Sequence, residues 1–435
     1  MRCFPASKAE TGVRMRGKRV WLAAIVVVAM GLAACSSSDK SKTATGGTQA
    51  TTSTLPGGIN VKDWNSVLAA AKGQTINLYM YGGSDQINTY INGYLKGELA
   101  KAGVTLNQVK ITDTVEAVNK VLGEKQAGKD TGGSVDMIWV NGENFKTLKQ
   151  ADYWYCGYVR DLPNAKYVNF SDPSITNDFG LAVDDCESPW ARAQSVVVYN
   201  SAKVNASDLK SAATMMAYIK AHPGSFTYPA PPDFTGSMAV RTFFYAQAGG
   251  FNGLLGAFDK TKYDSIAPGL WKTLNDLEPS LWQQGKTYPA AQTDVSTLYA
   301  NGEISMFLTY GSGSVGQDVS KGTFPATTRE AVFDSGMLGN ISYLGIPKNA
   351  ADKAAALVLA NIELSPDAQL EKDKETGLYP SINLATAPNA AAFAAIPTPP
   401  SVLPFDQQVK NTNPEVQADW VTTLEKDWKA NVQQR

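Results

Sequence analysis

Four short segments at predicted strand ends carry small, hydroxyl, amide or carboxylate residues: Gly82-Gly83-Ser84, Asn141-Gly142-Glu143-Asn144, Thr235-Gly236-Ser237 and Tyr310-Gly311-Ser312. Three of the segments, those at 82–84, 235–237 and 310–312, open a helical pattern, and the segment at 141–144 gives amide and carboxylate groups next to Trp139. In an open α/β sheet such loops lie beyond the carboxyl ends of the strands, where ligands bind. The sequence therefore predicts a binding site formed by these loops, although ordinary turns and helix N-caps use the same residue types.

The loops and the aromatic residues beside them supply the candidate contacts. Backbone N–H groups at helix starts favour anionic groups, whereas aromatic faces and carboxylates favour a cation. A thiamine-like ligand, with a cationic ring and a phosphate-like or hydroxyl tail, would use both features. The alternative is that Trp139 and Trp190 are core residues. The candidate ligand-binding residues are Tyr81, Gly83, Ser84, Trp139, Asn141, Glu143, Asn144, Trp190, Asp233, Thr235, Ser237, Tyr310 and Ser312.

The sequence offers little for catalysis. Its one histidine, His222, precedes Pro223 and is expected to end a helix. A Ser/His/Asp triad or a zinc site built on histidine would have to use this residue, and the sequence has no Gly-x-Ser-x-Gly or Cys-x-x-Cys motif. We therefore expect a protein that is not an enzyme, with no catalytic residue, metal site or cofactor. A secreted carboxylate-dependent hydrolase remains a less favoured alternative.

The N-terminal region has the pattern of a lipoprotein signal. A basic start at 15–19 is followed by an apolar run at 20–30 and then by Leu32-Ala33-Ala34-Cys35. This order is typical of a secretory signal, and the apolar run is too short to span a bilayer, which takes ~20 residues. Because Cys35 follows Leu-Ala-Ala as in a bacterial lipobox, we predict a signal peptide at 1–34, lipidation of Cys35 and an extracytoplasmic, membrane-anchored protein. An ordinary signal is the alternative, and translation can start at Met1 or Met15.

Charge and cysteine content narrow the class of protein further. Residues 1–34 hold six basic residues and one acidic residue, which leaves 33 basic and 39 acidic residues in the remainder. This acidic balance argues against a nucleic-acid partner. In an oxidising compartment Cys156 and Cys186 are expected to form a disulfide, with two buried thiols as the alternative. The Ser/Thr/Gly-rich stretch at 36–58 is typical of a flexible linker, and we place the linker at 35–60.

Strand and helix patterns alternate through most of the remaining chain, which predicts an α/β fold. Strands are expected at 75–81, 104–111, 135–140, 194–199, 226–228, 304–309 and 341–346. Helices are expected at 63–72, 86–102, 115–127, 209–221, 238–248, 270–284 and 293–301, with mainly helical structure from 350 onward. An irregular stretch at about 152–190 interrupts the alternation. Val416, Trp420, Leu424 and Trp428 form a stripe at helical spacing, which predicts a face that packs on the core.

Several segments carry a resemblance to a known family. Residues 344–350, 354–360 and 364–369 resemble the C-terminal part of solute-binding proteins of ABC importers. More specifically, the chain is similar to YnjB-type binding proteins in the segments 81–84, 133–145, 178–180 and 226–237. The resemblance covers most of residues 64–385 and implies a two-lobed type II periplasmic-binding-protein fold, each lobe a mixed sheet flanked by helices. The cysteine pair is not part of it.

The resemblance implies how the protein works. Lobe 1 is placed at 61–195 and 340–435, lobe 2 at 196–339, and hinge strands at 194–199 and 339–346. The expected function is capture of a small polar solute, thiamine-like or polyamine-like, by hinge closure. A monomer would deliver it to an ABC permease and its ATPase, with lipid as its only contact with the membrane. A sensor lipoprotein of the same fold is the alternative.

Overall fold

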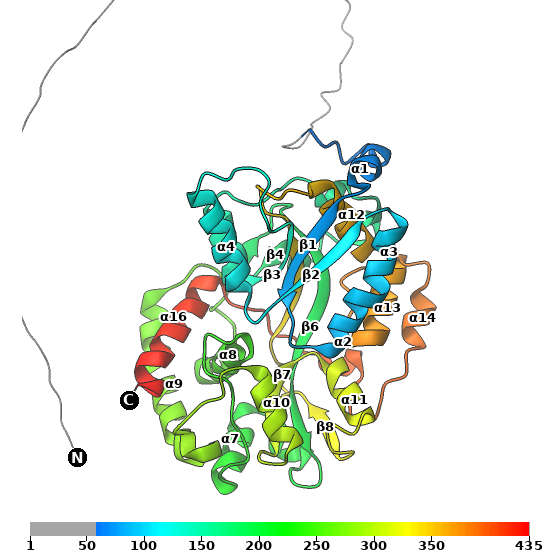
Figure 1. Cartoon of the computed structure of the whole chain (residues 1–435). Coiled ribbons are helices and arrows are strands. Elements are labelled where there is room, and N and C mark those ends of the chain that lie inside the picture. The colour runs from blue at the N-terminus through cyan, green and yellow to red at the C-terminus, as the bar shows by residue number, and fades with distance from the viewer. Residues whose placement is uncertain (1–57, 435) are drawn as a thin grey trace, which may run out of the picture. The chain divides into compact units, whose positions relative to one another are not determined.

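The computed structural model describes residues 58–434 (Figure 1). The proposed signal peptide at 1–34, the lipidation site Cys35 and the linker up to residue 57 lie outside the described residues. None of the helices in the described part of the chain has the length and apolar character needed to cross a bilayer. The fold and the candidate site therefore both lie within residues 58–434.

The first lobe is built on parallel strands that alternate with helices. Strands β1 (Thr75–Tyr81), β2 (Thr105–Ile111) and β3 (Met137–Val140) pair in the order β2-β1-β3. In β1 the side chains of Ile76, Leu78 and Met80 are buried and those between them are less so, as the period of a strand requires. The flanking helices are α1 (Trp64–Ala71), α2 (Asp85–Tyr90), α3 (Lys96–Lys101), α4 (Thr114–Gln126), α5 (Gly142–Gln150), α12 (Lys353–Glu363) and α13 (Pro366–Thr376).

One long strand, β6 (Glu187–Asn200), belongs to both lobes. Its first half pairs with β9 (Gly339–Gly345), which also pairs with β3, and its second half pairs with β7 (Met306–Tyr310) and β8 (Thr328–Ala331). The seven strands therefore form one mixed sheet that runs through both lobes (Figure 1). The two segments predicted to connect the lobes, 194–199 and 339–346, overlap with β6 and β9, and they meet at the Gln194–Gly339 pair, after which β6 pairs with β7 and β8.

The second lobe places helices around the far half of β6. They are α7 (Ala212–Ala221), α8 (Phe234–Ala248), α9 (Lys260–Leu277), α10 (Gln292–Ala300), α11 (Ser312–Ser320) and α16 (Ala418–Trp428). Asp233 caps the start of α8, and Gly249, with φ +76°, ends it. His222 is the C-cap residue of α7, as the sequence indicated.

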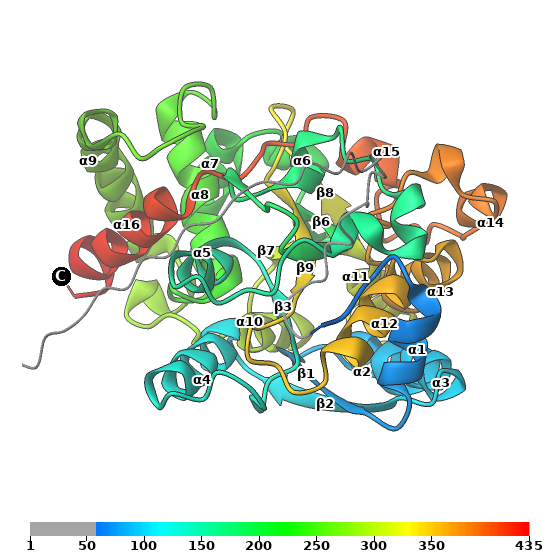
Figure 2. The ribbon, with the colours of Figure 1, turned by 90° about the horizontal axis from the view of Figure 1, so that it is seen from above.

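The C-terminal segment corrects the assignment of 340–435 to the first lobe. Trp420, Leu424 and Trp428 are each at most 1% exposed and pack in the second core, with Val416 and Val432. Figure 2 shows α16 beside α8 and α9. The stripe therefore packs on the core as predicted, but on the core of the other lobe, because its large indole rings fill the space beside α8.

Other differences are local. The expected strand at 226–228 is only an isolated bridge between Phe226 and Met306. Conversely, β6 starts at Glu187, inside the stretch expected to be irregular, because Pro189 hides the strand pattern. The sulfur atoms of Cys156 and Cys186 are bonded, and this disulfide ties the loop after α5 to the start of β6.

Short elements complete the chain. They are α6 (Pro173–Thr176), β4 (Asn177–Asp178), β5 (Leu181–Ala182), α14 (Ala390–Ala394), α15 (Phe405–Gln408), the 3-10 turns Val159–Asp161, Pro163–Tyr167, Ala206–Leu209, Glu278–Ser280, Trp282–Gly285 and Leu384–Thr386, and the π-helical turns Ile91–Leu95 and Lys429–Gln433.

Candidate ligand-binding site

The loop after β3 forms a sharp entry into α5. Gly142 adopts φ +62°, a conformation that favours glycine, and its N–H donates to Oδ2 of Asp178 at 2.6 Å. Asn141 is the N-cap residue but makes no side-chain capping bond. Its amide is therefore not used for capping, and Glu143 follows in the first turn of the helix.

The loop before α8 is also fixed by hydrogen bonds and by a close backbone contact. Asp233 accepts hydrogen bonds from the N–H groups of Thr235 and Gly236, both at 2.9 Å. A Cβ atom on Gly236 would lie 2.1 Å from the carbonyl oxygen of Pro229, so only glycine fits this close approach. Asp233 thus caps a helix, as the alternative interpretation of this loop proposed, and it orients the hydroxyl groups of Thr235 and Ser237.

Ser237 leads into a network that the sequence did not reveal. Its hydroxyl donates to Oε1 of Glu425 at 2.5 Å and accepts a hydrogen bond from Nη1 of Arg241 at 2.7 Å. Arg241 pairs through Nε and Nη2 with both oxygens of Glu415, at 2.8 and 3.3 Å. Tyr310, at the end of β7, donates its hydroxyl to the same carboxylate. Arg241 and Glu415 are almost completely buried, and their two-point contact fixes both side chains.

Glu143 of the first lobe lies within electrostatic reach of this network. Burial raises the pKa of Glu143, while Arg241 acts to lower it and Asp113 and Glu415 act to raise it. Burial and then Glu143 raise the pKa of Glu425 to about 7. The two carboxylates, one from each lobe, therefore sense each other. We call Glu143, Ser237, Arg241, Tyr310, Glu415 and Glu425 the interlobe cluster.

Aromatic rings border the interlobe cluster. The ring of Phe179 lies under the guanidinium of Arg241, 5.5 Å from ring centroid to Cζ. Phe234 lies between Phe179 and Tyr310, with centroid distances of 6.3 and 5.2 Å. Such faces can make apolar contact with a small molecule, and the neighbouring carboxylates can pair with a positive group.

The loop at 82–84, which follows β1, leads to a contact with α11 of the second lobe. Ser84 caps α2 and accepts a hydrogen bond from the N–H of Ile87 at 3.3 Å. Two residues on, Nε2 of Gln86 reaches Oδ1 of Asp318 in α11 at 3.5 Å. Burial raises the pKa of Tyr81, and Asp233 of the second lobe raises it further.

The predicted residues divide into groups. Glu143, Ser237 and Tyr310 join the interlobe cluster, and Tyr81 lies near Asp233. Trp190 is only 1% exposed and packs behind Trp139, which matches the core alternative. Other predicted residues lie beside these groups: Gly83 under the Tyr81 ring, Asn144 with Nδ2 3.5 Å from Oε1 of Glu143, and Thr235 nearly buried, while Ser312 begins α11.

Arg241, Glu415 and Glu425 were missed by sequence reasoning. Arg241 stands one helical turn after Ser237, a spacing that puts both on one face of α8. No sequence pattern marks Glu415 and Glu425. Glu415 reaches the site because the segment before α16 bonds to the second lobe, and Glu425 because α16 packs there.

Two further findings concern the described residues outside the interlobe cluster. A surface groove of about 520 Å³ beside α7 is lined by residues that include Lys203, Asp208 and His222, and by none of the candidate residues. Within residues 58–434 no three His, Cys, Asp or Glu side chains are grouped so that they could hold a metal ion.

The chain matches known proteins over most of its length. Residues 94–398 match the family described as bacterial extracellular solute-binding protein. The chain belongs to this family. It is also 34% identical over 371 residues to protein YnjB of Escherichia coli strain K12, a match that covers 85% of this chain and 94% of that protein.

Solved structures confirm the predicted type II periplasmic-binding-protein fold. An ABC transporter substrate-binding protein from Bradyrhizobium japonicum USDA 110 superposes with a TM-score of 0.61 and 16% identity, covering 83% of this chain and all of that chain. The spermidine/putrescine substrate-binding protein PotD from Streptococcus pneumoniae gives 0.57 and 15%, covering 82% and 99%. AfuA from Actinobacillus pleuropneumoniae, with fructose-6-phosphate bound, gives 0.56 and 12%, covering 83% and 99%. The fold thus accommodates chemically different solutes.

The family determines the general role. The protein is an extracellular solute-binding protein, which takes a small-molecule ligand. The family is described as extracellular, so the protein acts outside the cytoplasm.

Proposed function

We propose that this protein captures a small cationic solute, polyamine-like or thiamine-like, between its two lobes and delivers it to an ABC permease. The observation that carries the proposal is the charge balance of the interlobe cluster. Glu143, Glu415 and Glu425 surround one cation, Arg241, and Asp113 adds to their field. Since Arg241 is already paired with Glu415, Glu143 and Glu425 have no cationic partner within the cluster.

A cation between the lobes would remove the main electrostatic cost of closure. Glu143 belongs to the first lobe and Glu425 packs with the second. Burial raises the pKa of both carboxyl groups, and the charge of Glu143 raises the pKa of Glu425 further. Like charges brought together away from water repel each other. A positively charged solute converts this repulsion into attraction, which couples binding to closure.

The aromatic rings support the same class of solute. Tyr310 and Phe234 lie on the second-lobe side, and Trp139 lies in β3 on the first-lobe side, opposite Leu344 of β9. Aromatic faces attract cations and also accept flat or aliphatic groups. A solute with a charged head and an apolar body suits both kinds of contact.

Lipid attachment at Cys35 completes the proposal. The Leu-Ala-Ala-Cys pattern and the Ser/Thr/Gly-rich linker support an anchor that keeps the folded body near the membrane. A transporter complex in that membrane would then be within reach of the loaded protein.

Calorimetric titration with spermidine tests the solute class. Glu143→Gln keeps size and removes the charge, so it should weaken spermidine binding about tenfold, the effect of losing one charge-assisted contact of ~1.5 kcal/mol. Glu98→Gln on the surface of α3 is the matched control and should bind as the wild type does. Equal or tighter binding by Glu143→Gln would contradict a cationic solute. Native mass spectrometry of protein purified without denaturation would identify a solute that co-purifies.

A further inference from the structure

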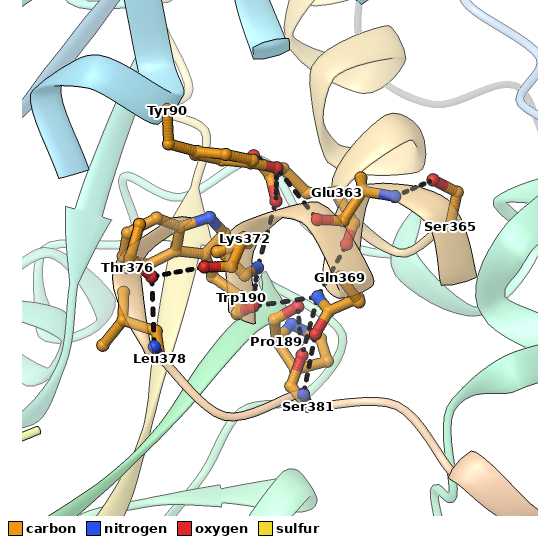
Figure 3. Close-up of polar contacts among 11 residues, drawn as sticks. Tyr90, Pro189, Trp190, Glu363, Ser365, Gln369, Lys372, Thr376, Leu378 and Ser381 are labelled. Atoms are coloured by element: carbon orange, nitrogen blue, oxygen red, sulfur yellow. Dashed lines mark hydrogen bonds and ion pairs between the residues drawn. The ribbon is translucent and has the colours of Figure 1, made fainter. Parts of the chain in front are cut away.

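A buried polar network lies behind the aromatic residues of the first lobe (Figure 3). Its ion pair joins Nζ of Lys372 in α13 to Oε2 of Glu363 in α12 at 3.1 Å, and both side chains are completely buried. The hydroxyl of Tyr90 donates to the two oxygens of Glu363 at 3.1 and 3.2 Å. Desolvation makes such a pair a weak source of stability. Its contacts with the neighbouring strand are therefore the better guide to its role.

The network contacts β6 at the place where its pairing with β9 changes register. The register between β6 and β9 shifts directly after Pro189, which takes Trp190 out of the regular ladder. The carbonyl oxygen of Trp190 accepts hydrogen bonds from Nε2 of Gln369, at 2.9 Å, and from Nζ of Lys372. The hydroxyl of Ser381 donates to the carbonyl oxygen of Pro189 at 3.2 Å. The backbone at the shift is thus held by α13 and the turn that follows it (Figure 3).

The same lysine touches the ring of Trp190. Its Nζ lies 5.0 Å from the ring centroid, a cation–π distance. The Trp190 ring also meets Trp139 edge to face, with centroids 4.4 Å apart. Trp139 is only partly buried and stands two residues before Asn141. A continuous line of contacts therefore joins the buried ammonium to a ring at the carboxyl end of β3.

We propose that Lys372 is a positioning residue for the solute site: paired with Glu363, it fixes Trp190, and Trp190 fixes the plane of the Trp139 ring against which the solute packs. This inference rests on the proposed function, because it requires Trp139 to contact the solute. Lys372 suits the task, since one ammonium group meets the carboxylate of Glu363, the carbonyl oxygen of Trp190 and the face of its indole ring.

A double-mutant cycle separates positioning from a general structural role. Lys372→Met is combined with Glu363→Gln so that no unpaired charge stays buried, and this pair variant is made in the wild-type and Trp139→Ala backgrounds. With spermidine as the probe, the pair variant should weaken binding about tenfold in the wild type and less than twofold in Trp139→Ala. The same factor in both backgrounds would overturn the inference.

A second readout needs no solute. In protein labelled with 5-fluorotryptophan, the ¹⁹F resonance of Trp139 is assigned by its loss in Trp139→Phe. The pair variant should shift or broaden that resonance, and so should Gln369→Met, which keeps the ion pair and serves if the pair variant does not fold. Leu277→Ala, buried in the second lobe, is the stability control and should leave the resonance in place. An unmoved Trp139 resonance would refute the positioning, whereas wild-type protein that fails to bind spermidine would count against the solute class alone.

Discussion

Replacement of Arg241 by methionine tests whether the interlobe cluster is held by its buried ion pair. Nε and Nη2 of Arg241 contact the two oxygens of Glu415 at 2.8 and 3.3 Å, and the side chains are 1% and 2% exposed. Methionine fills part of the same space without a charge. The variant leaves Glu415 buried with the hydroxyl of Tyr310 as its remaining cluster partner.

The expected loss of stability follows from leaving the Glu415 carboxylate buried without its cationic partner. Removing one partner of a buried ion pair costs about 3–5 kcal/mol, because the other charge stays without compensation. Ser237 loses a donor but keeps its bond to Glu425, so it adds little. We therefore expect the free energy of unfolding to fall by about 3–5 kcal/mol in Arg241→Met, measured by urea denaturation.

Two comparisons make the test decisive. Arg241→Met with Glu415→Gln removes both charges and should regain at least half of the loss, as replacement of whole buried pairs does. Lys260→Met breaks the exposed pair with Asp264 and should change stability by no more than about 0.5 kcal/mol. A loss below about 1 kcal/mol in Arg241→Met, or a double variant as unstable as the single one, would refute the reasoning.

Three further outcomes are expected. Cys35→Ser should abolish labelling by a fatty-acid analogue and release the protein from membranes; unchanged retention would rule out the anchor. Cys156→Ser with Cys186→Ser should lower the free energy of unfolding by about 3–4 kcal/mol in the chain-entropy model, since the bond spans 30 residues; two titratable thiols in unreduced, denatured protein that lacks residues 1–35 would exclude the bond. Because burial and Glu143 raise the pKa of Glu425 to about 7, protonation below that pH removes a charge that attracts cations. Spermidine binding should therefore tighten from pH 6 to pH 8, and Glu425→Gln should flatten that dependence in calorimetry; a steep dependence that persists in Glu425→Gln would assign the proton to another group.

The strands and helices of the first lobe could be predicted because their signals are local. In β1 the alternation of apolar residues marks the buried face, and Asp113 with Glu116 forms the capping box that starts α4. The family resemblance supplied the two-lobed arrangement, which no local pattern contains. Pro189 shows the limit of local reasoning, since a proline inside a strand is tolerated here only at a register shift.

Sequence reasoning selected some of the residues that the structure groups in the interlobe cluster, but not most of its charges. Glu143, Ser237 and Tyr310 stand at element ends, where sequence patterns are informative, and the structure brings them together. Glu415 and Glu425 come from the far end of the sequence. Their proximity to Arg241 depends on the tertiary packing of α16 and of the segment before it, and the spacing of Trp420, Leu424 and Trp428 indicates that this helix packs without indicating where.

The position of α16 also bears on when the protein can fold. Residues 416–432 leave the ribosome after every other described part of the second core, yet their three largest side chains, Trp420, Trp428 and Leu424, are at most 1% exposed within it. A growing chain therefore cannot complete that core until this helix has been made. The buried residues of the first core, by contrast, end at Leu364, so the first lobe can pack before the second during synthesis.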